Sequence, residues 1–161
     1  MMKVLITLSI ILFASSAYTQ TLKIGTMIKY LNATKAHITD DLLNKGFSFN
    51  GKKEEKHVDS YVDLFYWTNS RISDEDLTKV FEYNLNELNE KATIKTISVR
   101  YRTASSADYL LLKKELPTLG FKFIDEGDYK GELVSVYNNT LYTLSIWVSS
   151  DGKYDLSVKK L

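Results

Sequence analysis

Residues 42–49 read Leu-Leu-Asn-Lys-Gly-Phe-Ser-Phe, and residues 116–123, 74 positions further along, read Leu-Pro-Thr-Leu-Gly-Phe-Lys-Phe. Both stretches fit the pattern Leu-x-x-x-Gly-Phe-x-Phe. In each, the glycine can adopt the positive φ that ends a helix, and the two phenylalanines share one side of the strand that follows. The pattern therefore predicts two tandem units, each a helix followed by strands.

The amino terminus has the layout of a secretory signal peptide. Lys3 precedes an apolar run over 4–14, and the small residues at 15–17 suit cleavage after Ala17, with Gln20 as the alternative. The apolar run is about half of the ~20 residues that span a bilayer, and no later stretch is long enough. Because the chain has no Cys, a lipid-anchored lipoprotein is excluded. We expect a secreted or periplasmic protein without a membrane span after cleavage.

The remaining chain of about 144 residues is enough for one compact unit. Without Lys3 it has 20 basic and 20 acidic side chains, a balance that gives no general attraction to nucleic acid or to an anionic membrane. Without disulfides, packing alone must hold the fold. We expect the signal peptide to cover 1–17, the first part of the compact unit 18–103 and the second part 104–161.

Hydrophobic spacing and turn residues predict the elements of both parts. In the first part we expect helices over 24–31 and from Thr39 to Gly46, a strand from Phe47 to a hairpin turn at Asn50-Gly51, and strands over 58–67 and 94–103. In the second part we expect a helix from Ser105 or Ser106 to Leu119 and strands over 121–124, 133–137, 141–148 and 154–158.

Residues 72–91 fit two descriptions. Alternate positions from 80 to 85 suit a half-buried strand, whereas Leu77, Phe81, Leu85 and Leu88 also recur at helical spacing. Aromatic and β-branched residues over 78–83 favour the strand, and the helix stays open as the alternative.

These elements predict an α+β fold. Two tandem α-β-β-β(-β) repeats would form one mostly antiparallel sheet with the helices on one face. The similarity of Leu-Phe-Tyr-Trp at 64–67 to Leu-Ser-Ile-Trp at 144–147 extends the repeat and makes Trp67 equivalent to Trp147. Chance similarity of short stretches is the alternative.

Groups that could carry catalysis are scarce. The chain has no Cys nucleophile, and its two histidines, His37 and His57, lack a zinc-binding pattern. The acidic run over 125–128 lacks the residue order of an EF-hand loop, and no glycine-rich phosphate loop is present. We therefore expect no catalytic, cofactor-binding or metal-binding residues, and we do not expect an enzyme.

Trp67 and Trp147 are the main candidates for a binding surface. Alternation places them opposite the positions assigned to the core, which are Val62, Leu64, Tyr66, Tyr142, Leu144, Ile146 and Val148. Both tryptophans would then lie on the open face, with Tyr61 and Phe65 near Trp67. An exposed aromatic sheet face binds protein, peptide or sugar. If the face assignment is reversed, the tryptophans belong to the core.

Arg100 and Arg102 are two of only three arginines, and alternation places both on the solvent face of the strand 94–103. They could receive an acidic partner or a carboxylate. The alternative is a pair of cross-strand contacts with acids such as Glu82 or Asp63.

The chain resembles a group of small secreted bacterial proteins that have no assigned function. The likeness rests on Lys-Gly-Phe-x-Phe at 45–49, on the Tyr- and Lys-rich strands, and on Leu-Lys-Lys-Glu-Leu-x-x-Leu-Gly-Phe-Lys-Phe at 112–123. More distantly, tandem α/β units behind a signal peptide resemble β-lactamase inhibitory proteins and PepSY-like periplasmic domains. That resemblance implies an open, aromatic-rich sheet face that binds another protein. This chain departs from the inhibitors because it has no disulfides.

Three functions follow as hypotheses. The first is a secreted or periplasmic, non-catalytic protein that binds another envelope or secreted protein through the open sheet face. The second is a carrier of a sugar or a lipophile, which needs a closed pocket between helices and sheet. The third is a hydrolase, which needs ionisable groups that converge in a cleft.

Overall fold

The computed structural model describes residues 21–56, 60–69, 79–88 and 95–161. The helices are α2 (Ile24–Tyr30), α3 (Lys35–Asn44) and α4 (Ser106–Thr118). The strands are β1 (Ser48–Lys56), β2 (Ser60–Asn69), β3 (Lys79–Leu88), β4 (Lys95–Thr103), β5 (Lys122–Tyr129), β6 (Glu132–Asn138), β7 (Tyr142–Val148) and β8 (Tyr154–Lys160). The predicted signal peptide lies outside the described residues.

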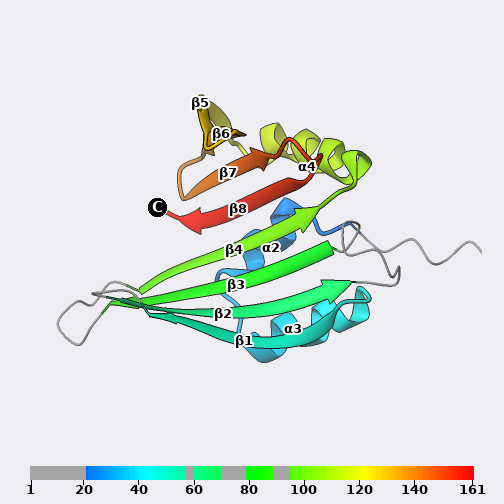
Figure 1. The fold of residues 1–161 in the computed structure, drawn as a ribbon, viewed down its shortest axis with the longest axis vertical. Helices are drawn as coiled ribbons and strands as arrows, with labels where there is room; N and C mark the ends of the chain where they lie inside the picture. The colour runs from blue at the N-terminus through cyan, green and yellow to red at the C-terminus, as the bar shows by residue number, and fades with distance from the viewer. Residues whose placement is uncertain (1–20, 57–59, 70–78, 89–94) are drawn as a thin grey trace, which may run out of the picture.

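Eight strands of the described chain form one antiparallel sheet in the order β1-β2-β3-β4-β8-β7-β6-β5 (Figure 1). Strands β1 to β4 form one meander and β5 to β8 form another, and the two meanders meet where β4 pairs with β8. The predicted α+β character and the antiparallel sheet are confirmed. Residues 72–91 could be a strand or a helix by sequence, and the described part of this segment is a strand, β3.

The core lies between the helices and one face of the sheet. It contains apolar side chains from all three helices and, from the central strands, residues such as Phe81, Tyr101, Leu144 and Leu156. In Figure 1 α2 and α3 lie behind the strands. The opposite sheet face carries no helix in the part of the chain that the structure describes, and we call it the open face.

Both Gly-Phe junctions have the same geometry. Gly46 and Gly120 take φ values of 81° and 73°. The amide of Phe47 donates to the carbonyl of Leu42 at 2.9 Å, and the amide of Phe121 donates to that of Leu116 at 3.0 Å. This six-residue closure, with the glycine amide bonded three residues back, is the Schellman ending of a helix. The local prediction from Leu-x-x-x-Gly-Phe is confirmed at both places.

Replacing Gly120 with alanine should lower the free energy of unfolding by about 1–2 kcal/mol, because a side chain at positive φ places Cβ against the next carbonyl. Gly127 is the matched control: its φ is not positive, and a Cβ added there meets no atom within 4 Å. Gly127→Ala should change the free energy by less than about 0.5 kcal/mol in urea unfolding. Equal losses in the two variants would contradict the Schellman assignment.

Two local predictions in the first part are wrong. Helix α3 begins at Lys35 rather than near Thr39, because the Thr34 hydroxyl accepts a hydrogen bond from the amide of His37 and caps the helix earlier. Asn50-Gly51 does not turn the chain. It forms a bulge in β1, between the pairs Phe49–Trp67 and Gly51–Tyr66, and the strand continues along β2.

Candidate functional site

Trp67 and Phe65 lie on the covered face of the sheet. Trp67 is 0% exposed and Phe65 is 8% exposed. The Trp67 ring lies 5.3 Å from the ring of Phe49 and 5.7 Å from that of Phe81. Trp67 therefore belongs to the core, which is the second of the two alternatives given above. The expected placement of Trp67 and Phe65 on the open face is wrong.

The register between strands explains the reversal. Trp67 lies opposite Phe81 on β3, and both enter the core. Tyr66 lies opposite Glu82, which lies opposite Arg100, so Tyr66 belongs to the open face. Val62 and Leu64 alternate with Trp67 in the same way as Tyr66 and share its face, so the prediction that these three residues belong to the core is wrong. Because β2 has large apolar residues at both odd and even positions, alternation alone could not decide its orientation.

Trp147 lies on the open face. Its neighbours on β7, Leu144 and Ile146, are buried against the helices, whereas Trp147 is half-buried on the other side. Trp67 and Trp147 do not occupy matching strands, since Trp67 lies on β2 and Trp147 on β7. The position that corresponds to Trp67 in the second meander is Tyr137, which pairs with Phe123 as Trp67 pairs with Phe49.

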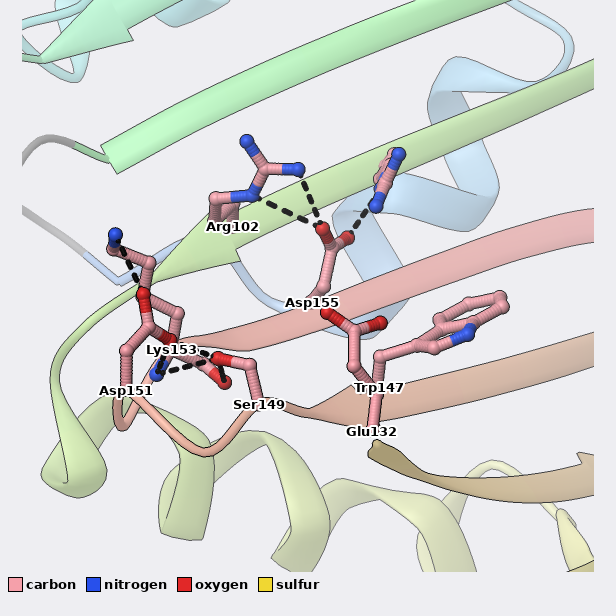
Figure 2. A pocket seen from close by; sticks show the side chains of 8 residues that line it. Arg102, Glu132, Trp147, Ser149, Asp151, Lys153 and Asp155 are labelled. Carbon is pink, nitrogen blue, oxygen red and sulfur yellow. Dashed lines mark hydrogen bonds and ion pairs between the residues drawn. The ribbon is translucent and has the colours of Figure 1, made fainter. Parts of the chain in front are cut away.

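Arg100 and Arg102 also lie on the open face, where one carboxylate holds both. Arg100 Nε donates to Asp155 Oδ1 at 2.5 Å, and Arg102 donates to Asp155 Oδ2 from Nε at 3.1 Å and from Nη2 at 2.9 Å (Figure 2). The Asp155 side chain is 9% exposed, against 37% and 39% for the arginines. The buried carboxylate therefore fixes two half-exposed guanidinium groups in place.

The predicted cross-strand pairs are correct in part. Glu82 lies opposite Arg100 and approaches it to 3.9 Å. Asp63 on β2 instead forms an ion pair with Lys52 on the neighbouring strand β1, at 2.7 Å, and both side chains lie on the covered face of the sheet. Asp155, the main partner of both arginines, could not be foreseen because it reaches them only through the pairing of β4 with β8.

Trp147 is next to this charged cluster. Asp155 lies directly opposite Arg102 on one side and Trp147 on the other, so the three residues form a row across β4, β8 and β7. The guanidinium carbon of Arg100 lies 6.0 Å from the centre of the Trp147 ring, within the range of a cation–π contact. The structure thus brings together three of the predicted surface residues, Trp147, Arg100 and Arg102.

A hollow of about 140 Å³ opens among these side chains (Figure 2). Its lining residues come from β4, β6, β7, β8 and the turn between β7 and β8, and they are Arg100, Arg102, Glu132, Trp147, Ser149, Asp151, Lys153 and Asp155. In the turn, the amide of Lys153 donates to Ser149 Oγ at 3.2 Å, and Lys153 Nζ pairs with Asp151 at 2.8 Å. These interactions hold the turn in one conformation, and the turn forms one side of the hollow.

Arg100 keeps its charge on this face. Burial alone would lower the pKa of Arg100, but the hydrogen bond and the negative charge of Asp155, with Glu82 and Glu132 nearby, raise it overall. The hollow thus offers fixed cationic donors, a carboxylate and an aromatic ring side by side. Of the lining residues, only Arg100, Arg102 and Trp147 are predicted surface residues.

The remaining predicted residues are placed as follows. The backbone of Tyr61 pairs with Lys56 on one side and Glu87 on the other, and its side chain lies outside the described part. His37 is exposed on α3, and His57 lies outside the described residues. The acidic run 125–128 lies in β5 at an edge of the sheet.

The described residues contain neither a cluster of metal ligands nor a membrane-spanning helix. No group of three or more His, Asp or Glu side chains is placed to hold a metal ion. None of the helices there is long and apolar enough to cross a membrane.

Comparisons with known proteins identify no relative that could help to interpret the fold or this site. No protein-family model matches the chain, and neither a curated protein nor a solved structure is significantly similar to it.

Proposed function

We propose that the protein is a secreted or periplasmic, non-catalytic binding protein that holds another envelope or secreted protein on its open face. The observation that supports this most is the cluster of Trp147 with Arg100 and Arg102 at the middle of an uncovered sheet face. Tryptophan and arginine are the residues most enriched among those that dominate binding energy in protein interfaces. We call the cluster and the residues around its hollow the binding face.

The arginines are suited to this role because they are already ordered. A surface arginine normally loses rotamer freedom when a partner binds, at a cost of about 0.5–1.5 kcal/mol for each immobilised side chain. Here Asp155 fixes both guanidinium groups before binding. Guanidinium N–H groups that do not point at Asp155 stay available to carbonyl or carboxylate oxygens of a partner, since each guanidinium has five donors.

A carrier of small ligands is the second candidate, and the core packing speaks against it. A carrier needs a cavity of about 300–1,000 Å³ between helices and sheet. In the described residues this space holds the largest fully buried side chains of the protein, which are Trp67, Tyr30, Tyr101, Phe47 and Phe81. The hollow on the open face, at about 140 Å³, is smaller than such a cavity.

We also propose that the two meanders are tandem repeats. Three parallels support this beyond the Gly-Phe junctions. The first strand of each meander has a bulge directly after a phenylalanine. The bulge lies between Phe49 and Gly51 in β1 and between Phe123 and Asp125 in β5. The amide side chains of Asn69 and Asn139 each donate to the carbonyl that ends the preceding helix, at 3.4 and 3.1 Å. Each second strand then leads into two further antiparallel strands.

Export belongs to the same proposal. If residues 1–17 form a signal peptide, the protein recovered from producing cells begins at Tyr18, or at Thr21 if cleavage follows Gln20. Intact-mass measurement of the protein from the secreted or periplasmic fraction distinguishes these two products from a chain that retains Met1.

Position-specific photo-cross-linking tests the binding role. A photoreactive amino acid at Ser145 would lie on the open face, in line with Ser157 and Arg100, and one at Lys114 would lie on the exposed side of α4. With envelope and secreted fractions of the producing cells, we expect one specific adduct from Ser145, none from Lys114, and a loss of that adduct in a Trp147→Ala background. Adducts from Lys114 alone, or equal adducts from both positions, would refute the proposal.

A further inference from the structure

We infer that the hollow beside Trp147 accepts the uncharged carboxamide of an asparagine or glutamine side chain of the bound protein. The carboxamide oxygen receives hydrogen bonds from Arg100 or Arg102, and the carboxamide NH₂ group donates to Glu132. The inference rests on the proposed function, since it names the chemistry of the group that the partner places on the binding face.

The charges that line the hollow cancel. The three cations are Arg100, Arg102 and Lys153, and the three carboxylates are those of Glu132, Asp151 and Asp155. A charged side chain from a partner, of either sign, would leave this partly enclosed site with an unbalanced charge and would also lose its own hydration. The charge balance therefore favours an uncharged polar group.

The β4 side of the hollow presents hydrogen-bond donors that Asp155 does not use. Arg100 donates to Asp155 from Nε alone, and its Nη1 lies 3.9 Å from Glu82. Arg102 donates from Nε and Nη2. A guanidinium has N–H groups on all three of its nitrogens. Nη2 of Arg100 and Nη1 of Arg102 are therefore left for an acceptor that enters the hollow.

The β6 side presents an acceptor. Glu132 lines the hollow from β6, and among the described residues its carboxylate takes part in no hydrogen bond or ion pair (Figure 2). The charge of Glu132 acts on Arg100 through space without a direct bond. Donors and an unused acceptor thus face each other across the hollow.

The spacing of the strands favours a group that bridges the two sides. Asp155 on β8 holds both guanidinium groups, and β8 is separated from β6 by β7. At ~4.8 Å between neighbouring strands, β8 and β6 are about 10 Å apart, and the Glu132 side chain covers only part of this distance. A carboxamide has its acceptor and its donors on different atoms, so it can accept from an arginine and donate to Glu132 at once. A hydroxyl has both on one oxygen and reaches less far.

The aromatic wall and the size of the hollow suit one such side chain. Trp147 lies opposite Val134, the next residue after Glu132 on the same face of β6, so its indole flanks the path to Glu132. The volume of about 140 Å³ is below the range of about 300–1,000 Å³ that ligand pockets occupy. The turn from Ser149 to Lys153 closes one side. A single planar amide on a short apolar stem, entering from the open side, matches this shape.

Four small probes test the inference without the partner. N-acetyl-glutamine methylamide carries the carboxamide. The glutamate analogue has nearly the same shape with a negative charge, the lysine analogue carries a positive charge, and the methionine analogue has a similar length without a polar end. All four share the same backbone groups, so differences between them report on the side chain.

The indole N–H signals of Trp147 and Trp67 report binding in a ¹⁵N-labelled protein, assigned with Trp147→Phe. We expect the glutamine probe to shift the Trp147 signal with a dissociation constant of roughly 10 mM, and the signal of the buried Trp67 to stay unchanged. The other three probes should bind at least about tenfold more weakly, because each loses a hydrogen bond to a charged group or adds an unbalanced charge. Raising NaCl from about 0.05 to about 0.5 M should change the affinity for the uncharged glutamine probe less than about twofold.

Glu132→Met supplies the decisive variant. It removes the acceptor at similar side-chain length and should weaken the glutamine probe at least about tenfold. Glu126→Met is the matched control, because the Glu126 side chain is bonded to Ser135 on the covered face, away from the hollow. An unchanged Trp67 signal shows that each variant is folded. No shift of Trp147 up to about 100 mM of the glutamine probe, equal or tighter binding of any other probe, or full binding to Glu132→Met would each overturn the inference.

The outcome is separable from that of the proposed function. If the Ser145 adduct forms but the glutamine probe does not shift Trp147, the binding face stands and the carboxamide inference is wrong. If the glutamine probe binds as expected but Ser145 gives no specific adduct, the hollow recognises a carboxamide and the protein-binding role is wrong.

Discussion

Trp67→Ala should lower the free energy of unfolding by about 3–5 kcal/mol, the range for removing a buried tryptophan. The side chain is 0% exposed and packs between Phe49 and Phe81. Its indole Nε1 has no hydrogen-bond partner among the described residues, so the loss comes from packing. A change of this size approaches half of the stability of an ordinary domain, and urea unfolding should show it as a large fall in midpoint.

Trp147→Ala is the matched comparison, since it makes the same substitution on the opposite sheet face. Because Trp147 is half-buried and faces away from the helices, the expected loss is about 1 kcal/mol or less. Equal losses, or a larger loss for Trp147, would show that the faces of β2 or β7 are assigned incorrectly.

Asp155→Asn should have the second largest effect, on stability and on binding together. Removing one partner from a buried ion pair costs about 3–5 kcal/mol. Since both arginines are more than one-third exposed and water can solvate them, we expect about 2 kcal/mol here. The freed guanidinium groups should also lose their fixed orientation, and the yield of the Ser145 adduct should fall at least about tenfold.

Asp63→Asn is the control for Asp155→Asn. It removes the partner of Lys52, whose side chain is 43% exposed, and exposed pairs contribute about 0–1 kcal/mol. Chemical unfolding and cross-linking yield should both remain close to those of the unchanged protein. If Asp155→Asn behaves like Asp63→Asn in both measurements, Asp155 does not organise the binding face.

Local patterns predicted the helix endings and one strand face correctly. The Leu-x-x-x-Gly-Phe pattern is sufficient for a Schellman ending because its hydrogen bonds join residues only five positions apart. In β4, Ile97, Val99 and Tyr101 alternate with polar residues, so only one face could be buried. Arg100 and Arg102 were placed on the open face for this reason.

Other features depend on contacts between distant parts of the chain. The orientation of β2 follows from its neighbours, since both of its faces are apolar. Asn50-Gly51 is typical of a hairpin turn, yet continuous pairing with β2 makes it a bulge. Asp155 meets Arg102 across 53 positions of sequence, and Glu132 reaches the same hollow from β6. No periodic pattern in the sequence carries this information.

Hydroxyl-radical footprinting of the protein with its cross-linking partner tests the central claim, that the open face around Trp147 is the binding surface. Oxidation of Trp147 is followed by mass spectrometry in the free and bound states. Tyr129 and Leu111 serve as exposed references on β5 and α4. We predict that binding slows oxidation of Trp147 at least about fivefold and leaves both references unchanged, because an interface core excludes water from its central residues. Unchanged oxidation of Trp147 together with protection of Leu111 would contradict the claim and place the partner on the helices.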